Sequence, residues 1–243
     1  MMILNTLIKK MTSNTISTAS LSTALLFTAI TTNAFAISPY AATYSFNLDN
    51  KASGVATRVL SKQGNNWAYD FEAKIPVIAT ANEKSVFSIN NNQVVSKSYQ
   101  RQYKILVHRQ ITNLQFNPTT KNIDIKKDQK NSQLPWQMGV LDDLNVEIQI
   151  REDLKHGGLK SSYLIADHKD VTARQFVNEG LVKVSTPMGN YDAYKVRINY
   201  AKKNKSTVFW LAPSLDYLLV KMTHNDGSSV YTLNLTKYQP KTS

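Results

Sequence analysis

The chain has 243 residues, and 29 lysines and arginines stand against 17 aspartates and glutamates, which gives a net charge of +12. It contains no cysteine, which excludes a disulfide-stapled scaffold, thiolate metal sites and cysteine nucleophiles. A chain of this length can bury a substantial apolar core.

The first 36 residues have the pattern of an export signal. Lys9 and Lys10 supply a positive start, residues 19–30 form a short apolar stretch, and Ala34 and Ala36 fit the small-x-small rule for cleavage. The apolar stretch is short and interrupted by Ser and Thr, so it is poorly suited to span a bilayer. We therefore expect a signal peptide at 1–36, a single β-rich domain at 37–243 and a periplasmic location. An uncleaved N-terminal anchor is the alternative.

The charge of the mature chain bears on its partners. Without the predicted signal, 27 basic residues stand against 17 acidic ones, a net charge of +10. Outside the cytoplasm the available polyanions are phospholipid headgroups, lipopolysaccharide and cell-wall polymers rather than nucleic acid. We expect an anionic lipid, a lipoprotein or an envelope protein as partner, no nucleic acid, and no membrane-spanning segment after cleavage. The lysines are scattered, so a solvated basic surface without a partner is the alternative.

Alternation of apolar and polar residues dominates the mature chain. Residues 66–75 place Trp67 and Phe71 on one face and charged residues on the other, which is typical of an antiparallel strand with one wet face. We expect both rings in the core. The same alternation recurs at residues 42–48, 190–200 and 230–238. Short turn signals rich in Asn, Asp and Gly separate the strands, which indicates a sandwich, a barrel or a strongly curved sheet.

The segment 97–109 is the most unusual predicted strand. Tyr99, Arg101 and Tyr103 share one largely apolar face. An arginine between two tyrosines is suited to hold an anionic headgroup by charge and stacking. The alternative is that Arg101 extends to solvent or lies at a sheet edge.

One segment departs from the strand pattern. Between residues 139 and 158, Leu141, Leu144 and Ile148 have helical spacing, and Asp142 or Asp143 is suited to the start of a helix. Lys, His and two glycines follow at its end. These features predict one helix of about 12 to 14 residues. Its second half also alternates as a strand would, which leaves a strand as the alternative there.

No group of residues indicates catalysis. The four histidines lack metal-ligand spacing, and the polar run at residues 166–170 is better explained as a hairpin loop than as a metal site. The chain has no G-x-S-x-G nucleophile motif. The adjacent Asp142 and Asp143 point in different directions, so they do not make a catalytic carboxylate pair. We expect no enzyme activity, no cofactor and no metal.

Two sequence segments near the C-terminus contain clear strand and turn signals. Residues 186–196 hold a Pro-containing turn followed by a strand. Residues 206–222 hold a strand ended by Pro213, a turn and a returning strand. Phe209 and Trp210 lie on opposite faces of the first of these strands, so one covers the core and the other meets the helix or a ligand. Trp210 therefore joins the candidate ligand-binding residues.

These phrases resemble an exported bacterial family, domain of unknown function 3108. Its members show T-P-L-G-x-[FY]-x-[AT]-x-K-V, then W-[LV]-[AS]-P, then a phrase like D-Y-L-P-V. The matching residues here are Thr186, Pro187, Gly189, Tyr191, Ala193, Lys195, Val196, Trp210, Ala212, Pro213, Asp216, Tyr217, Leu218 and Val220. Leu219 departs from the proline of the last phrase and restores a backbone N–H to the strand.

At the level of fold, the pattern also resembles periplasmic lipoprotein carriers and sigma-factor regulators, which curve an antiparallel sheet around a helix. We therefore expect a mainly β protein, an antiparallel curved sheet or half-barrel with one helix packed against it. The function we expect is non-enzymatic: a periplasmic cell-envelope protein that binds a lipid, a lipoprotein or another amphiphile in a concave site with Tyr99, Arg101, Tyr103 and Trp210. The alternative is an interaction module that regulates envelope assembly and has a filled core.

Overall fold

The computed structural model describes residues 37–200 and 204–241. The strands within them are β1 Tyr40–Leu48, β2 Ala52–Gln63, β3 Asn66–Ile75, β4 Ala79–Asn90, β5 Gln93–Ile105, β6 His108–Asn117, β7 Asn122–Lys127, β8 Lys130–Pro135, β9 Leu141–Asp142, β10 Tyr163–Ala166, β11 Val171–Thr186, β12 Gly189–Asn199, β13 Ser206–Ala212, β14 Leu218–Asn225 and β15 Val230–Pro240. The helix α1 is Val146–Lys155, and a 3₁₀ turn spans Pro213–Leu215. The predicted signal at residues 1–36 lies outside the described residues, so export stays a prediction.

All of these strands join one sheet. Most neighbours in the sheet are also neighbours in sequence, paired antiparallel through tight turns. Residues with positive φ stand at these turns, among them Gly64, Asn92 and Gly227, at positions where the sequence contains turn signals. The short β9 is the exception, because it pairs parallel to β10.

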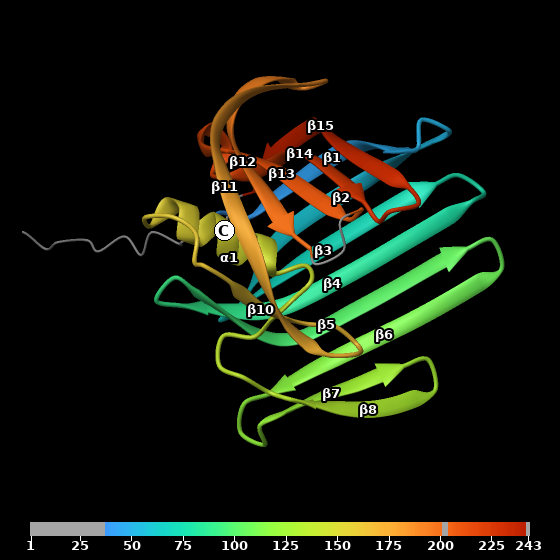
Figure 1. Ribbon diagram of the computed structural model, residues 1–243, viewed down its shortest axis with the longest axis vertical. Coiled ribbons are helices and arrows are strands. Elements are labelled where there is room, and N and C mark those ends of the chain that lie inside the picture. The colour runs from blue at the N-terminus through green and yellow to red at the C-terminus, as the bar shows by residue number, and fades with distance from the viewer. Residues whose placement is uncertain (1–36, 201–203, 242–243) are drawn as a thin grey trace, which may run out of the picture. The chain divides into compact units, whose positions relative to one another are not determined.

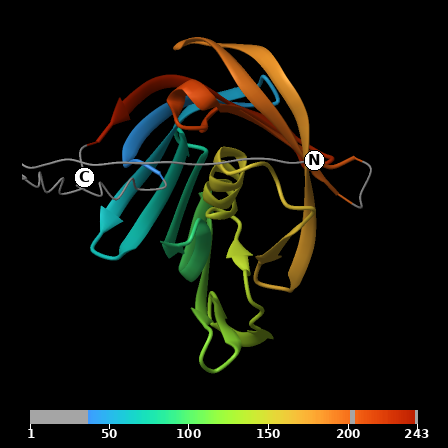
Figure 2. The same cartoon turned by 90° about the vertical axis from the view of Figure 1, so that its left-hand side faces the viewer.

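The sheet is curved and open rather than closed into a barrel (Figures 1 and 2). The first strand pairs with the last, so that Tyr40 lies opposite Pro240. The two edges are β8 and β9. The predicted fold class, an antiparallel curved sheet with one helix packed against it, is confirmed.

The helix lies within the curve of the sheet (Figure 2). It has 10 residues and begins later than expected, because Leu141 and Asp142 belong to β9. The carboxylate of Asp142 then accepts hydrogen bonds from the backbone N–H groups of Leu144 and Asn145, which makes a turn ahead of the helix. At the other end Gly158 donates its N–H to the Asp153 carbonyl, so the glycines end the helix as predicted.

Residues 146–153 of α1 are all buried, and they include charged side chains. Surface helices of globular proteins usually keep one polar face in water, so a helix buried all round must satisfy its charges inside the protein. Across residues 37–200 and 204–241, no helix combines the length and apolar character needed to cross a bilayer.

The core follows the alternation of the strands, with one correction. Trp67 is 2% exposed, as predicted. Phe71 is only partly buried, so its predicted place in the core is wrong. Its ring lies on the concave face as expected, where it packs against the edge of the core and also borders a hollow.

Candidate functional site

A hollow of about 520 Å³ lies on the concave side of the sheet and reaches the first turn of α1. Strands β1–β5 line one side, strands β10–β15 line the other, and the helix contributes Val146 and Glu147. Figure 2 shows the helix between these two groups of strands. The volume falls within the range of roughly 300–1,000 Å³ that is typical of small-molecule sites. We call this space the central hollow.

The side formed by β11–β15 holds a group of apolar side chains. The rings of Phe176 and Phe209 stack with centroids 6.5 Å apart, and Met222 is the cross-strand neighbour of Phe209. Tyr231 stacks on Phe46 of β1 at 5.7 Å. All five side chains line the central hollow, where they offer an alkyl chain an apolar surface beside polar residues such as Thr207 and His224.

Alanines on the facing strands make room for the hollow. Ala73 and Ala81 are cross-strand partners, and both line it. Their row continues through Ala56 to Tyr44 on one side and to Tyr103 on the other. Because an alanine side chain ends at Cβ, the three alanines between Tyr44 and Tyr103 leave a depression in the concave surface of the sheet.

The next row on the concave face is polar. Arg58, Phe71, Glu83 and Arg101 are successive cross-strand partners in β2–β5. The Arg58 guanidinium lies 4.9 Å from the centroid of the Phe71 ring, a cation–π contact. Tyr99 donates a hydrogen bond of 2.5 Å to Glu83. Burial raises the pKa of Glu83, although the Tyr99 hydrogen bond and the Arg101 charge oppose this shift.

A buried ion pair attaches α1 to the sheet. Arg58 Nη1 lies 2.5 Å from Glu147 Oε2, and each side chain is 6% exposed. Tyr69 donates to the other Glu147 oxygen at 2.8 Å and accepts from Arg58 at 2.9 Å. Burial by itself would lower the pKa of Arg58, but the Glu147 carboxylate together with Tyr69 and Tyr44 outweighs it and holds this pKa well above its usual value. Arg58 therefore stays protonated where it lines the hollow, and the Glu147 carboxylate balances its charge.

Asp143 lies between two other guanidinium groups. Its Oδ1 is 2.8 Å from Arg174 Nη1, and its Oδ2 is 3.7 Å from Arg101 Nη1. The Nε of Arg101 is buried and has no hydrogen-bond partner among the described residues. A buried N–H donor without a hydrogen-bond partner is costly to the fold.

Comparison with known proteins bears on family and fold. Residues 39–236 match the model of a family described as "Protein of unknown function (DUF3108)". The chain belongs to this family. A β-barrel-like protein of the domain of unknown function DUF1849 from Brucella abortus is similar in structure, with a TM-score of 0.58 and 14% identity, covering 85% of this chain and 99% of that one. At this identity the likeness shows the fold alone. No curated protein matches the chain.

The DUF3108 phrases of the sequence have identifiable structural roles. Pro213 ends β13 as predicted and begins the 3₁₀ turn. Asp216 follows with a left-handed backbone, φ 57°, and its carboxylate lies 2.6 Å from Lys155 Nζ. Its carbonyl accepts a hydrogen bond of 2.9 Å from the buried Arg151. This phrase therefore holds the C-terminal half of α1.

Of the four candidate ligand residues of this DUF3108 domain, Arg101 alone lines the central hollow. Tyr99 is buried behind it and bonds to Glu83. The Tyr103 hydroxyl donates to Gln110 at 2.6 Å. Trp210 lies on the other face of its strand, with Lys221 Nζ 5.3 Å from its ring, while its neighbour Phe209 faces the hollow. Ligand binding stays a prediction for all four, and the geometry supports it best for Arg101.

Sequence patterns missed several residues of the site. An arginine on an apolar strand face is the signal that marked Arg101. Arg58 shows the same signal, because it stands between Ala56 and Leu60 on the buried face of β2. Its partner Glu147 and the second guanidinium of Arg174 had no local signal, since strand and helix positions far apart in sequence meet only when the sheet curves.

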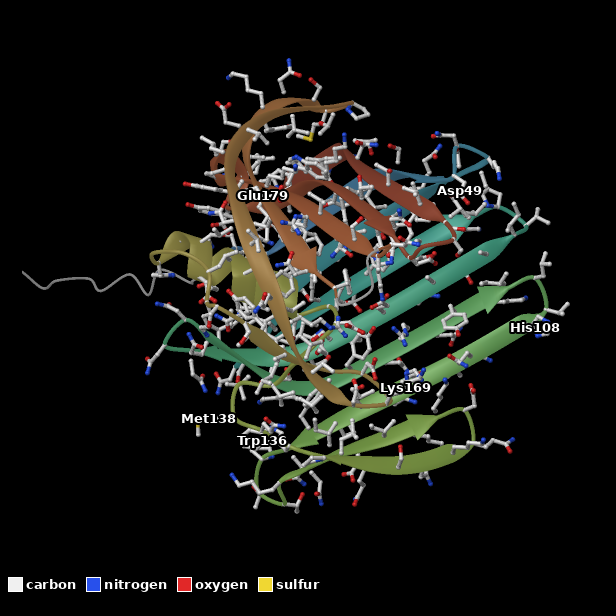
Figure 3. The ribbon with its side chains drawn as sticks, in the orientation of Figure 1. Asp49, His108, Trp136, Met138, Lys169 and Glu179 are labelled. Atoms are coloured by element: carbon white, nitrogen blue, oxygen red, sulfur yellow. The ribbon has the colours of Figure 1, made fainter. Side chains whose placement is uncertain are left out.

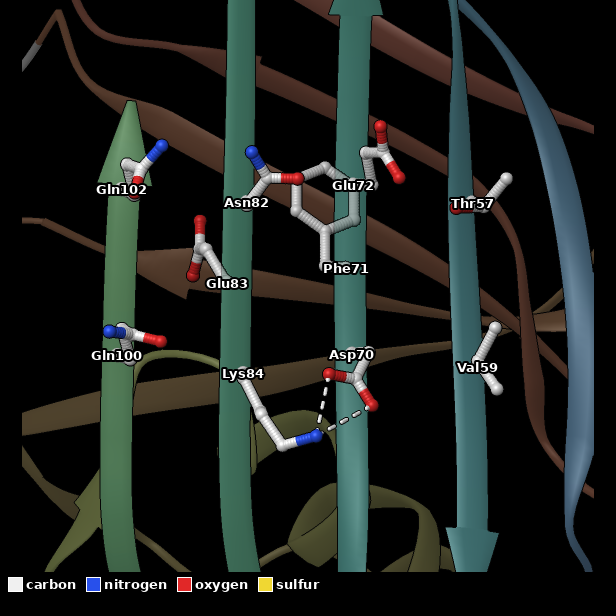
Figure 4. A pocket seen from close by; sticks show the side chains of 10 residues that line it. All are labelled: Thr57, Val59, Asp70, Phe71, Glu72, Asn82, Glu83, Lys84, Gln100 and Gln102. Carbon is white, nitrogen blue, oxygen red and sulfur yellow. Dashed lines mark hydrogen bonds and ion pairs between the residues drawn. The ribbon is translucent and has the colours of Figure 1, made fainter. Parts of the chain in front are cut away.

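A second hollow, of about 360 Å³, lies on the outer face of β2–β5 (Figure 4). Thr57, Glu72, Asn82 and Gln100 are among its lining residues. Its one ion pair joins Lys84 and Asp70 at 3.2 Å, and both side chains are more than 40% exposed. An ion pair this exposed contributes little to stability. The hollow belongs to the polar, solvent-exposed face that is usual for an antiparallel sheet.

Metal ligation and histidine chemistry find no support in the described residues. Within them, no group of three or more His, Cys, Asp or Glu side chains is arranged to hold a metal ion. The polar run at 166–170 is a loop between β10 and β11, in which Asp167 accepts the backbone N–H groups of Lys169 and Asp170. His224 lines the hollow and lies 2.6 Å from Thr207 Oγ1.

Proposed function

We propose that the protein is a non-enzymatic binding protein of the bacterial cell envelope that holds an anionic amphiphile in the central hollow. A lipid and the acyl group of a lipoprotein share the alkyl chain, and the anionic head is that of a lipid. One observation carries the proposal: the hollow joins the rings of Phe176 and Phe209 to the guanidinium groups of Arg101 and Arg174, which both lie beside the Asp143 carboxylate. The envelope location rests on the predicted signal peptide.

Cations and carboxyl groups line the hollow in equal number, namely Arg58, Arg101, Arg174 and Lys205 against Glu83, Asp143, Glu147 and Asp167. An anionic head is therefore favoured by the local position of Arg101 and not by an excess of positive charge. Arg58 is paired with Glu147, whereas Arg101 and Arg174 both lie beside the Asp143 carboxylate, and Arg101 is also the cross-strand partner of Glu83. Burial raises the pKa of Glu83, while the Tyr99 hydrogen bond and the Arg101 charge oppose this shift. An anionic head bound at Arg101 gains a charge-assisted hydrogen bond, and the alkyl chain covers the apolar side chains of β11–β15.

The head-group contact is tested with a fluorescent long-chain fatty acid and Arg101 variants. We expect Arg101→Glu to weaken binding by about 1 to 3 kcal/mol, because it replaces a charge-assisted hydrogen bond with a repulsion. Arg101→Lys should retain most of the affinity, since it keeps the charge. If Arg101→Glu unfolds the protein and Arg101→Lys does not, Arg101 is a structural ion-pair partner of Asp143 and the head-group assignment fails.

The apolar part is tested by filling the hollow. Ala81→Phe places a ring in the low part of the sheet and should abolish fatty-acid binding. Asn82→Phe is the matched control, because the next residue of β4 carries its side chain on the outer face. Melting temperatures of both variants verify folding. If wild type binds no fatty acid at any salt concentration, or if both variants bind as wild type does, the amphiphile proposal is wrong. The interaction module without a ligand then takes its place.

A further inference from the structure

Two neighbouring loops present bulky aliphatic side chains to solvent. In the β3–β4 loop, Val77 is 97% exposed and Ile78 is 43% exposed. At the β5–β6 turn, Ile105, Leu106 and Val107 are 51%, 63% and 86% exposed. Large aliphatic residues at such exposure are ordinary when single, whereas a group of them marks an interaction surface.

The two loops form one surface. Leu106 donates its backbone N–H to the Ile78 carbonyl at 2.9 Å, and Ile105 is the cross-strand partner of Ala79. Both loops lie at the same end of the sheet (Figure 1). We call the five residues Val77, Ile78, Ile105, Leu106 and Val107 the apolar tip.

The backbone at the apolar tip is strained. Val77 has a φ of 65° and Leu106 a φ of 54°, in the left-handed region that a β-branched or bulky residue adopts only at a cost. Most other turns of this sheet place Asn, Asp or Gly at positive φ, as at Asn92, Asp128 and Gly227, with Lys121 and Tyr217 as further exceptions. Val77 and Leu106 therefore gain neither a relaxed backbone nor burial within the described fold, and strain of this kind accompanies functional sites.

Cations lie directly behind the apolar tip. Lys74, Thr80, Lys104 and Arg109 are successive cross-strand partners on the outer face of β3–β6. Lys74, Lys104 and Arg109 are exposed. The row contains no acidic residue, so aliphatic loops and a band of positive charge stand together at one end of the sheet.

We propose that the apolar tip enters the headgroup region of an anionic lipid bilayer, with Lys74, Lys104 and Arg109 on the lipid phosphates. Aliphatic side chains backed by cations are the combination that binds a peripheral protein to such a surface. The apolar tip consists of two turns that project from the sheet. Such a shape can insert between the mobile headgroups of a bilayer. This surface function goes beyond the ligand site, although Ala73 and Ala81 of the hollow lie only two residues from the strand ends that carry the β3–β4 loop.

Vesicle sedimentation tests the proposal with bilayers of phosphatidylcholine alone and with added phosphatidylglycerol. Wild type should sediment with the anionic vesicles and be released by salt. Val77→Asn combined with Leu106→Asn should lower the affinity at least tenfold, and Lys104→Gln combined with Arg109→Gln should remove the preference for anionic lipid. Met138→Asn is the matched aliphatic control: Met138 is 84% exposed and lies far from His108 and the tip (Figure 3). Lys237→Gln is the control for charge.

The depth to which the apolar tip inserts is measured with a polarity-sensitive dye on an introduced cysteine. The chain has no cysteine of its own, so the dye attaches at one position only. A dye at Val107→Cys should shift to the blue on addition of anionic vesicles, and a dye at Met138→Cys should not. The proposal is wrong if wild type ignores vesicles, if the tip variants bind like wild type, or if both dyes respond equally. Fatty-acid binding by the tip variants separates this proposal from the ligand site, since they leave the hollow intact.

Discussion

Arg58 of β2 and Glu147 of α1 are joined at 2.5 Å across the concave face of the sheet, and 89 residues separate them in sequence. Tyr69 completes the contact, so the first turn of the helix is held by charge and hydrogen bonds rather than by apolar packing alone. The same pair closes the polar side of the central hollow. Stability and site geometry therefore depend on the same contact.

Removal of one partner of this pair should be far more harmful than removal of both. Glu147→Leu leaves a buried, uncompensated guanidinium and should lower the free energy of unfolding by about 3 to 5 kcal/mol. The double variant Arg58→Met/Glu147→Leu should recover much of that loss, because well-packed apolar residues often replace a buried pair without penalty. Urea denaturation measures both. Equal losses in the single and double variants would contradict this account.

Asp142 should make stability depend on pH. Burial raises the pKa of this carboxyl to about 7, although the Ser85 hydrogen bond opposes the shift. Its unfolded pKa is about 4, so between about pH 4 and pH 7 the folded state holds a proton that the unfolded state has lost. Stability should therefore fall as the pH rises through this window, by up to about 1.4 kcal/mol per pH unit, and the contribution should be flat above it.

The comparison with Asp142→Asn isolates this effect, because the amide keeps the acceptor for the Leu144 and Asn145 N–H groups but does not titrate. The histidines remain in both proteins. Burial lowers the pKa of His224, so its contribution has the opposite sign and cancels in the difference. Unfolding free energies at pH 5, 6, 7 and 8 give the two curves. Parallel curves would show that Asp142 is ionised in the folded state throughout.

Relief of strain at the apolar tip should stabilise the fold. Asparagine tolerates positive φ better than valine or leucine, so Val77→Asn and Leu106→Asn should each raise stability by about 1 kcal/mol. That corresponds to a melting temperature higher by about 2 to 4 °C for a domain of this size. Val107→Asn is the control, because Val107 is as exposed but lacks a positive φ. A lower melting temperature in the first two variants would show that these side chains pack within the fold.

Two phenylalanines of adjacent strands should differ in their contribution to stability. Phe87 is 0% exposed, so Phe87→Ala should cost about 3 to 5 kcal/mol. Phe71 borders the hollow and is only partly buried, so Phe71→Ala should cost about 1 to 2 kcal/mol. Chemical denaturation of the two variants compares them directly. A loss at Phe71 as large as that at Phe87 would mean that the hollow is filled in solution.

The sequence predicts the strands well because alternation and turn residues are local. Residues 66–75 alternate, and Gly64 and Asn65 precede them, so β3 is found with its correct bounds. The same local rule puts Phe209 and Trp210 on opposite faces. It does not say which face is concave, because that depends on how the neighbouring strands curve, and Trp210 proves to be the outer residue.

The start of the helix and the full site depend on contacts that no local pattern reveals. Leu141 and Asp142 leave the helix because they pair with β10, whose matching residues are Ile165 and Ala166. Glu147 looks like an ordinary surface residue of an amphipathic helix, yet it is 5% exposed. Its burial follows from the sheet curving around α1, which the pattern of apolar residues does not specify.

The pairing of β1 with β15 has a consequence for the order of folding. Tyr40 and Pro240 are brought together from opposite ends of the described chain, whereas nearly every other strand pairs with its sequence neighbour. Hairpins close quickly, but a contact across so long a loop is entropically unfavourable and slow to form. The two halves of the sheet should therefore assemble as separate meanders and join last. Until the C-terminal strand has paired with β1, the sheet does not surround the charged helix completely. The partly folded chain is then accessible to chaperones and proteases.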